Sequence, residues 1–500
     1  MNAQRLKTCW HKLPRKTLRE LQAKQLRAYL RDIVLPFHSH YRELFSRHGL
    51  DWRAIETLED LSRVPFTSKS DLVGGAERAR EFVIAPDPSQ LARRPSTILR
   101  GLLLGPNRAR RVLDREFRPI LMTSTTGRSA DPVPFVYTAH DLAMLRVAGF
   151  RMMQLAGARQ GDRMLNMFPF APHLAFWQTH YAGTEFGVFL LSSGGGKTIG
   201  TEGNIRMLRK LNPDVLIGMP TFAYHVLREA VLDGVRCDKL RGIVLGGEKV
   251  PQGLRRKLRE CALSVGAGDI SVISTYGFTE AKMAWCECLF PVDSEPSGFH
   301  LYPDLGIVEI VDPDTGELKE DGQPGEIVFT SLDARGSCVL RYRTGDIIEG
   351  GMTYEPCPYC HRVMPRLLGR ISRCSDVREM QLDKIKGTLV DFNELEHVLD
   401  DMPRVGSWQI ELRKANDDPL EVDELVLHVC LADGGEESSV SQEIRRCLFE
   451  RAELHANRIE FHTDAEMRRL QGVGEKLKEQ KVVDRRSKAE TRDLTTTPQK

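Results

Sequence analysis

Between residues 164 and 277, short apolar runs alternate with segments of helical periodicity, and this alternation restricts the fold more than any other feature. Each apolar run has the length of a buried strand, and the intervening segments repeat their apolar residues at helical spacing. Regular alternation of strand and helix is typical of an α/β fold with a largely parallel sheet. The predicted strands are 164–168, 188–191, 214–220, 242–247 and 271–277, and helices are predicted at 205–211 and 223–232.

Other patterns precede and follow this region. Residues 15–48 repeat leucine and other apolar residues at helical spacing, and residues 306–332 form two alternating runs around a turn-rich linker, which predicts a β-hairpin. A smaller α/β segment follows residue 377, with a helix at 393–402 and strands near 408–412 and 425–431. Because 500 residues are too many for one core, we expect two or three domains.

Composition excludes several classes of protein. The 71 basic and 69 acidic residues leave a formal charge of +2, so no global field attracts nucleic acid or an anionic membrane. No apolar run reaches the roughly 18 residues that a membrane helix requires, and the basic start of the chain lacks the apolar core of a signal peptide. The 11 scattered cysteines favour a reduced compartment over a disulfide framework. We therefore expect a cytoplasmic protein with no nucleic-acid or membrane partner.

Residues 75–118 are rich in arginine, with eight arginines between Arg93 and Arg118. The segment is interpreted in two ways, as a loop that carries basic surface or as the solvated face of an arginine-rich helix.

Three short motifs carry groups suited to a nucleotide. Thr123–Ser129 is a hydroxyl- and glycine-rich turn with a cation, which can bind phosphate oxygens although it lacks the Walker A spacing. Glu280 ends a Ser274–Glu280 motif at the end of a predicted parallel strand, where a carboxylate can hold Mg²⁺. Asp346 follows a glycine turn and can accept ribose hydroxyls. Taken alone, each motif has an ordinary structural explanation: a serine-rich turn, a helix N-terminus or a turn aspartate.

In this order, the three motifs resemble those of the adenylate-forming superfamily, which includes acyl-CoA synthetases, adenylation domains and luciferases. The phenylacetate–CoA ligase branch is the most similar, and the resemblance extends from about residue 25 to 486, with 75–118 as the main departure. The segments that carry it include LGGEKVP at 245–251, STYGFTE at 274–280, GFHLYPD at 298–304, GEIVFTSL at 325–332, RYRTGDI at 341–347 and CPYCHRVMPR at 357–366.

The resemblance implies a fold and a domain division. It implies an α/β chain with a large N-terminal adenylate-forming domain that has parallel sheets and a β-rich subdomain, followed by a small, mobile α+β C-terminal domain. The N-terminal domain would span 1–372, the C-terminal lid 373–486, and a polar, disordered tail 487–500. The hinge falls at Ser375 or Asp376, just after Ser372, which replaces the usual glycine.

The resemblance also implies the residues that bind ATP and catalyse adenylation. Glu280 matches the Mg²⁺ ligand, Asp346 the ribose ligand, Tyr276 the residue that packs on adenine, and Arg373 a contact to ribose or phosphate. The phosphate loop departs from the family at Ser124, usually glycine, and at Arg128, usually lysine. Lys478 matches the lysine that neutralises the α-phosphate, with Lys476 as the alternative register. The implied nucleotide-binding set is Thr123, Ser124, Thr125, Thr126, Gly127, Arg128, Gly246, Gly247, Glu248, Tyr276, Gly277, Thr279 and Asp346.

Cys357 and Cys360 have metal-ligand spacing. The resemblance implies that Cys288 and His300 join them in a structural zinc site, with Cys286 as a substitute for Cys288. The alternative is a pair of buried thiols beside a surface histidine.

The implied activity is ATP-dependent activation of a carboxylic acid to an acyl-adenylate, followed by transfer to CoA. The acid is expected to be aromatic or otherwise compact, with Phe170, His180, Tyr181 and Met219 as pocket candidates. A carrier-protein thiol, an amine or a hydroxyl stays open as the acceptor, and a homodimer stays open as the assembly. A catalytically dead binding module is the competing hypothesis, which the departures at Ser124, Arg128 and Ser372 favour and the retained Glu280 and Asp346 oppose.

Overall fold

The computed structural model describes residues 11–125, 132–291, 294–373, 377–383, 386–415, 422–432, 436–452, 454–473 and 479–486. By their contacts these residues divide into two compact units. The larger comprises Met1–Val250 and Lys257–Cys374, and the smaller comprises Pro251–Arg256 and Ser375–Lys500. None of the described helices has the length and apolar character needed to cross a bilayer.

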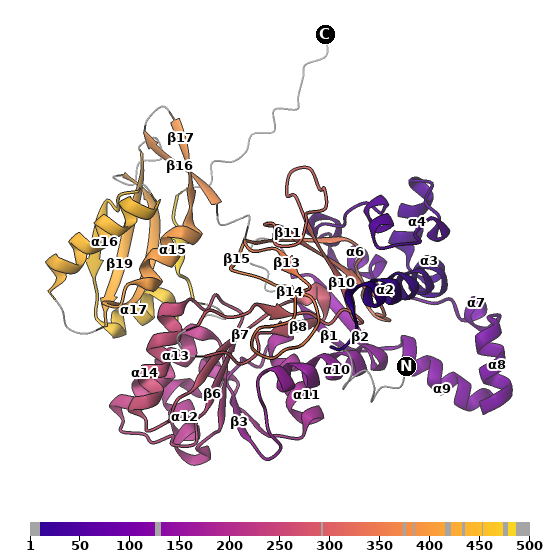
Figure 1. Cartoon of the computed structure of the whole chain (residues 1–500), viewed down its shortest axis with the longest axis horizontal. Coiled ribbons are helices and arrows are strands. Elements are labelled where there is room, and N and C mark those ends of the chain that lie inside the picture. Colours follow the sequence, from indigo (N-terminus) through magenta and orange to yellow (C-terminus); the bar gives the residue numbers. More distant parts are fainter. Residues whose placement is uncertain are drawn as a thin grey trace, which may run out of the picture. The chain divides into compact units, whose positions relative to one another are not determined.

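The larger unit is built on a nine-stranded sheet whose order is β13-β14-β9-β8-β7-β6-β5-β3-β4. Its strands from β4 to β7 are parallel neighbours, which confirms the α/β class (Figure 1). These strands are β3 (Arg163–Asn166), β4 (Phe189–Ser192), β5 (Val215–Gly218), β6 (Gly242–Gly246) and β7 (Ser271–Phe278). The helices between and before them are α10 (Ala139–Leu155), α11 (Leu174–Phe186), α12 (Gly195–Leu211), α13 (Pro220–Leu232) and α14 (Gln252–Ser264).

Beyond β7 the sheet continues with antiparallel strands, which the apolar alternation did not predict. They are β8 (Met283–Cys286), β9 (Phe299–His300), β13 (Met352–Thr353) and β14 (Arg366–Leu367). Most of them are two residues long, too short to show any periodicity.

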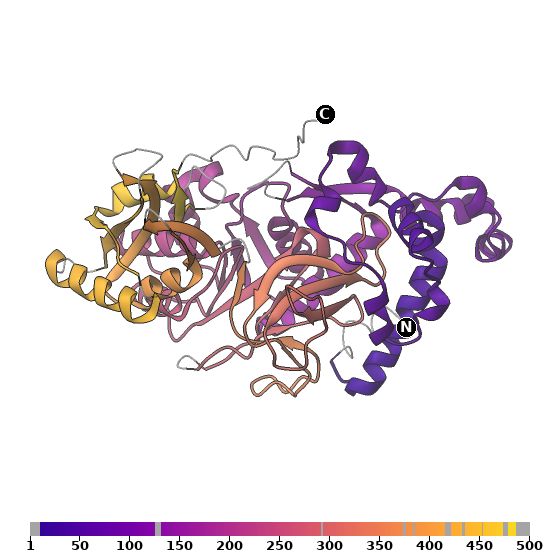
Figure 2. The same ribbon diagram turned by 90° about the horizontal axis from the view of Figure 1, so that it is seen from above.

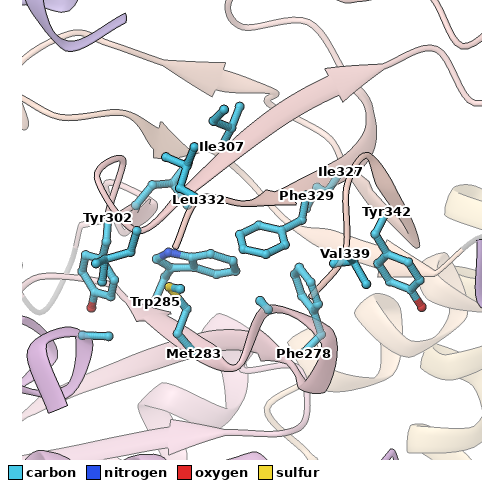
Figure 3. Close-up of a cluster of buried hydrophobic side chains, with 14 of the residues drawn as sticks. Phe278, Met283, Trp285, Tyr302, Ile307, Ile327, Phe329, Leu332, Val339 and Tyr342 are labelled. Carbon is cyan, nitrogen blue, oxygen red and sulfur yellow. The ribbon is translucent and has the colours of Figure 1, made fainter. Parts of the chain in front are cut away.

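A second sheet forms the β-rich part of the larger unit, in the order β10-β11-β12-β15. Strands β10 (Gly306–Val311) and β11 (Gly325–Ser331) are the hairpin expected at 306–332. They are followed by β12 (Tyr342–Ile348) and β15 (Ile371–Arg373). Trp285 of β8, Phe278 of β7 and Phe329 of β11 turn toward one another in the core between the two sheets, with Trp285 and Phe329 ring centroids 5.9 Å apart (Figure 3). This packing fixes the ends of β7 and β12 relative to each other.

Helices dominate the first 118 residues, as predicted for 15–48. They are α2 (Arg15–Tyr29), a π-helical turn at Leu30–Val34, α3 (Leu35–Phe37), α4 (Ser39–Arg47), α5 (Lys69–Leu72), α6 (Gly75–Glu81), α7 (Pro88–Ala92), α8 (Pro95–Leu104) and α9 (Pro106–Phe117), with short 3₁₀ turns at Trp52–Ala54 and Glu59–Arg63. The arginine-rich segment is therefore helical, and the interpretation as a loop is wrong. Strands β1 (Pro119–Ser124) and β2 (Pro134–Thr138) then form an antiparallel pair.

The smaller unit is an α+β fold. Its sheet has the order β20-β19-β18-β21, formed by β18 (Val405–Lys414), β19 (Asp423–Leu431), β20 (Arg458–Phe461) and β21 (Val482–Asp484). Ile410, Leu412, Leu427 and Val429 alternate along β18 and β19 and share one core with α15 (Phe392–Asp401) and α16 (Glu437–Ala452). A hairpin of β16 (Val377–Asp383) and β17 (Lys386–Asp391) and a short helix, α17 (Asp464–Gln471), complete the unit.

Candidate active site

Three residues from distant parts of the sequence meet where β7 and β12 lie close together. The Tyr276 hydroxyl donates a hydrogen bond to Asp346 Oδ2 at 2.8 Å, and Arg373 Nε lies 3.0 Å from Asp346 Oδ1. Asp346 and Arg373 are direct partners in the antiparallel β12–β15 ladder, so the backbone register brings them together. Asp346 is buried whereas Arg373 is 61% exposed. Burial, together with the carboxylate of Asp346, raises the pKa of Tyr276 well above its ordinary value.

Glu280 is a buried carboxyl in the 3₁₀ turn Thr279–Ala281 that follows β7. The Tyr342 hydroxyl donates a hydrogen bond to Glu280 Oε1 at 2.8 Å. Burial raises the pKa of Glu280, because a charge in this site loses its hydration. A buried carboxyl with a raised pKa is suited to a cation, which stabilises the ionised form that the protein alone disfavours.

The residues matched to the adenine side lie at the ends of β6 and β7. Gly247 has φ +86°, a conformation that glycine adopts at little cost, and it follows Gly246 at the end of β6. Glu248 Oε2 accepts hydrogen bonds from the Thr221 hydroxyl at 3.0 Å and the Thr221 N–H at 3.3 Å. A Cβ on Gly277 would lie 2.6 Å from the Ala284 Cβ, so the β7–β8 pairing requires glycine there.

The structure describes the expected phosphate loop up to Thr125 and again from residue 132. Thr123 is buried and its hydroxyl donates to the Tyr137 hydroxyl oxygen at 3.3 Å. The Thr125 N–H donates to the Val133 carbonyl at 3.1 Å and closes the loop at the far side. Ser124 donates its N–H to the Pro172 carbonyl at 2.6 Å. Thr126, Gly127 and Arg128 lie outside the described residues, and so do Lys478, Lys476 and the hinge positions Ser375 and Asp376.

Sequence reasoning missed two polar residues that hold this region. His173 Nδ1 lies 2.9 Å from the Ser124 carbonyl oxygen and precedes α11. Tyr342 positions Glu280 from the other sheet. Tyr342 lies within the RYRTGDI segment, so its place beside a quoted motif was the signal available, whereas nothing in the sequence links His173 to the loop.

A buried ion pair between Lys282 and Asp141 also connects elements of the candidate site. Lys282 Nζ lies 2.8 Å from Asp141 Oδ1, and both side chains are at most 8% exposed. Asp141 Oδ2 also accepts the Thr138 N–H at 2.8 Å and the Gly336 N–H at 2.7 Å. Burial alone would raise the pKa of Asp141, but the Lys282 ammonium and these hydrogen bonds outweigh it, so the pKa lies below its ordinary value. The pair ties β2, the turn after Glu280 and the loop before β12 into one scaffold.

Lys282→Met is therefore expected to destabilise the larger unit by about 3–5 kcal/mol, because it leaves Asp141 buried without its counter-charge. The measurement is urea unfolding followed by tryptophan fluorescence. Arg47→Ala is the matched control, because it breaks an exposed pair with Glu43 whose loss costs about 0.5 kcal/mol or less. Equal costs for the two variants would show that Lys282 is not a structural counter-ion.

Four potential metal ligands gather at the antiparallel end of the large sheet. Cys288, His300, Cys357 and Cys360 each bring one ligand atom to within 4.8 Å of the others. Cys288 Sγ lies 3.6 Å from Cys357 Sγ, and Cys360 Sγ lies 3.2 Å from His300 Nε2. Cys286 is not in this set, so the cluster is formed with Cys288.

The donor chemistry of this cluster fits zinc. Three thiols and one imidazole are a closed tetrahedral set, for which Zn–S bonds of about 2.3 Å place sulfurs close to the spacing observed here. Hydrogen bonds from the Cys288 and Cys360 thiols lower the pKa of Cys357, which favours the thiolate that a metal requires. The Ser297 hydroxyl lies 3.1 Å from Cys357 Sγ, where it can orient the ligand.

Three of the four pocket candidates, Phe170, His180 and Tyr181, are linked by ring contacts around α11. Phe170 and His180 both pack on Phe176, with ring centroids 5.2 and 6.0 Å from it. The Tyr181 ring lies 5.5 Å from the His180 ring by their centroids, stacks on Trp177 and lies under the guanidinium of Arg146. Met219 precedes α13 and reaches toward Gly247.

Comparisons with known proteins agree with this geometry. Residues 134–336 match the family model described as AMP-binding enzyme. The chain is 28% identical over 410 residues to a phenylacetate-coenzyme A ligase of Thermus thermophilus, and the match covers 80% of both chains. It is 25% identical over 348 residues to a phenylacetate-coenzyme A ligase of Aromatoleum evansii, covering 69% of this chain and 68% of that one.

A solved structure extends the similarity of fold. A 2-hydroxyisobutyryl-CoA ligase in the postadenylation state, in complex with 2-HIB-AMP, matches with a TM-score of 0.70 at 21% identity. The match covers 95% of this chain and 91% of that one, so the large and the small unit both have counterparts in the same fold.

Proposed function

Because this chain belongs to the adenylate-forming superfamily of AMP-binding enzymes, we propose that it activates a carboxylic acid with ATP and passes the acyl group to CoA. The first step joins the acid to the α-phosphate and releases pyrophosphate. In the second step the thiol of CoA replaces AMP on the acyl carbon, so the products are an acyl-CoA and AMP. The relatives named as phenylacetate-coenzyme A ligases support this class of reaction.

The observation that carries the proposal is the buried Asp346, held by Tyr276 and Arg373 within the same pair of sheets as Glu280. Asp346 has the position and charge to accept both ribose hydroxyls, and the ring of Tyr276 offers a surface for adenine. The exposed guanidinium of Arg373 can reach ribose or phosphate while it orients Asp346. A nucleotide bound here would lie with its phosphates toward the Thr123–Thr125 strand end.

Glu280 is proposed to hold Mg²⁺ on the phosphates. When bound, the ion offsets phosphate charge as the carboxylate oxygen approaches. Tyr342 fixes one oxygen of Glu280, which leaves the other for the cation. The Asp141–Lys282 pair keeps the turn that carries Glu280 attached to the strand pair that carries the phosphate loop.

Adenylation should therefore depend on pH and on Mg²⁺ together. The raised pKa of Glu280 means that protons compete with Mg²⁺ at a higher pH than for an ordinary carboxyl. As the pH falls, the apparent KM for Mg²⁺ should rise, and saturating Mg²⁺ should move the acid limb of the rate profile to lower pH. The measurement is initial rate against pH at limiting and at saturating Mg²⁺. An acid limb that does not move with Mg²⁺ would contradict the assignment of Glu280.

Cys288, His300, Cys357 and Cys360 are proposed to bind a structural zinc ion that fastens the loop after β8 to the turn before β14. Cys357→Ser should lose this zinc and several kcal/mol of stability, with aggregation as the visible result. Metal analysis and thermal unfolding test this. Cys237→Ser is the matched control, because it changes a buried thiol of the same unit outside the cluster. Active, folded wild-type protein without zinc would overturn the proposal.

The acid is proposed to be compact or aromatic. Phe176 and His180 of α11, together with Phe170 before it, form an aromatic group that can pack on a flat substrate. A panel of aromatic and small branched acids, assayed for CoA-dependent release of AMP, tests both the acid and the acceptor. Adenylation without any CoA-dependent release of AMP would point to a carrier-protein thiol or another nucleophile.

A further inference from the structure

A second group of metal-binding side chains lies in the smaller unit, away from the cysteine cluster. His428 on β19 and Glu460 on β20 are direct partners in the parallel ladder between these strands, and His462 follows two residues after Glu460. Side chains two residues apart on a strand share a face, so all three project from the same side of the sheet. The opposite side carries the apolar residues that pack on α15 and α16.

The ligand atoms converge on one nitrogen. His428 Nδ1 lies 2.9 Å from His462 Nε2 and 3.5 Å from Glu460 Oε2. One atom from each of the three residues falls within 4.8 Å of the other two. For an ion about 2.1 Å from each nitrogen, the 2.9 Å separation corresponds to an angle near 90°, as in an octahedral site; a tetrahedral zinc ion requires the two nitrogens to move apart by about 0.5 Å.

The other nitrogen of His428, Nε2, makes no hydrogen bond among the described residues, but it lies beside a carboxylate that could accept one. His428 Nε2 lies 3.4 Å from Glu411 Oε2, and Glu411 is a buried carboxylate on the neighbouring strand β18. Arg485 lies 3.3 Å from the same carboxylate oxygen and holds it in place. Metal-ligating histidines usually donate their second ring N–H to a carboxylate, which fixes the tautomer and makes the ligand nitrogen more basic.

We propose that His428, Glu460 and His462 bind a divalent first-row transition ion such as Zn²⁺, with Glu411 orienting His428. Two imidazoles and one carboxylate are ligands that zinc and its neighbours accept. His428 is buried, whereas Glu460 is 42% exposed, so the site opens to solvent on the side of Glu460. Such a three-ligand site leaves coordination positions for water, unlike the closed cysteine cluster.

The test counts zinc in full-length protein that has been purified without chelators, saturated with Zn²⁺ and desalted. The wild type should hold about two zinc ions per chain, and His462→Gln or Glu460→Gln should hold about one. His455→Gln, an exposed histidine of the same unit that stacks on Phe449, should keep both. An unchanged zinc count in His462→Gln, with normal circular dichroism, would overturn the proposal and leave a simple histidine hydrogen bond.

A separate feature is the apolar stripe on α8. Ile98, Leu99, Leu102 and Leu103 follow the i, i+1, i+4, i+5 spacing of one helix face and are 51–79% exposed. In both views α8 and α9 extend from the edge of the larger unit, and α8 packs mainly on α9 (Figure 1, Figure 2). Large aliphatic side chains gathered in this way are unusual on a soluble surface.

The same hairpin concentrates positive charge. Residues 95–117 contain five arginines against one aspartate and one glutamate, a formal charge of +3 in a chain whose total is +2, and Arg93, Arg94 and Arg118 flank the hairpin. Arg108, Arg110, Arg111 and Arg115 are exposed on α9, the helix on which α8 packs. Two copies of this surface would repel each other, whereas an anionic bilayer would attract the arginines and accept the leucines.

We infer that α8 and α9 dock on an anionic lipid surface, with Leu102 and Leu103 entering the headgroup region. Co-sedimentation with phosphatidylcholine vesicles, with and without phosphatidylserine, tests this. Binding should require phosphatidylserine, weaken with salt and fall at least tenfold in a Leu102→Ser/Leu103→Ser variant. Leu232→Ser, at an equally exposed leucine of α13, should bind like the wild type. Absence of vesicle binding, or a self-association that the double variant abolishes, would overturn the inference.

Discussion

Glu280→Gln is expected to lower the rate of acid-dependent adenylation by about 10²–10³-fold, which corresponds to about 3–4 kcal/mol of lost transition-state stabilisation. Glutamine keeps the shape of the side chain and can still accept the Tyr342 hydrogen bond, but it removes the charge proposed to hold Mg²⁺. The loss should therefore appear in the Mg²⁺ dependence and in the rate, while the binding of CoA changes little. Steady-state kinetics at varied Mg²⁺ and ATP provide the measurement.

The same substitution should leave the ligand-free protein at least as stable as the wild type at neutral pH. Burial raises the folded-state pKa of Glu280 above its unfolded value, so the folded state binds this proton more tightly. The stability from that protonation is present below the unfolded pKa and is lost as the pH rises through the folded pKa. A neutral glutamine avoids this loss. A large drop in Tm for Glu280→Gln would mean that the charge is part of the fold.

Asp346→Asn tests the proposed ribose contact separately from the proposed Mg²⁺ site. It should weaken the ion pair with Arg373 and the hydrogen bond from Tyr276, and it should raise the KM for ATP more than it changes the Mg²⁺ dependence. An unchanged apparent ATP affinity in both Glu280→Gln and Asp346→Asn would place the nucleotide elsewhere.

Lys478→Ala is the second substitution with a large expected effect, about 10²–10³-fold on acid-dependent pyrophosphate exchange. The family resemblance proposes Lys478 as the cation that offsets charge on the α-phosphate while the carboxylate attacks. Thiol transfer from a supplied acyl-adenylate should survive, because a rotation of the C-terminal domain would by then have removed the lysine. The two half-reactions are measured separately.

Lys476→Ala is the control for the alignment that assigns the catalytic lysine to position 478. It should lower the rates of both half-reactions only slightly. An adenylation defect in Lys476→Ala would shift the assignment by two residues. Equal losses in both half-reactions for Lys478→Ala would rule out a mechanism with two conformations. Normal exchange in both variants would leave Arg128 as the remaining cation.

The sequence predicted those parts of the fold that have a strong local signal. The apolar runs at 214–220, 242–247 and 271–277 contain β5, β6 and most of β7, because parallel strands are buried on both faces. The short strands β9, β13 and β14 could not be predicted, because two residues carry no period. Their place is set by partners distant in the sequence, such as His300 opposite Arg366.

The candidate site could likewise be predicted only where the residues stand in a recognisable sequence motif. Tyr276, Glu280 and Asp346 stand in motifs that the resemblance identifies, and the structure brings Tyr276 and Asp346 into contact. The Asp141–Lys282 pair has no local signal, because lysines are usually surface residues and the burial of Lys282 depends on elements that are distant in the sequence: the start of α10, the turn after Glu280 and the loop before β12. The choice between Cys286 and Cys288 also required coordinates, since Cys286 ends β8 and Cys288 follows only two residues later.

The most direct test of the proposed activity is exchange of labelled pyrophosphate into ATP by the wild-type protein without CoA. We expect exchange that requires both Mg²⁺ and an acid from the panel, because adenylation is reversible until a thiol takes the acyl group. Absence of exchange with every acid, in folded protein that still binds ATP, would contradict the account and identify the chain as a nucleotide-binding module without ligase activity.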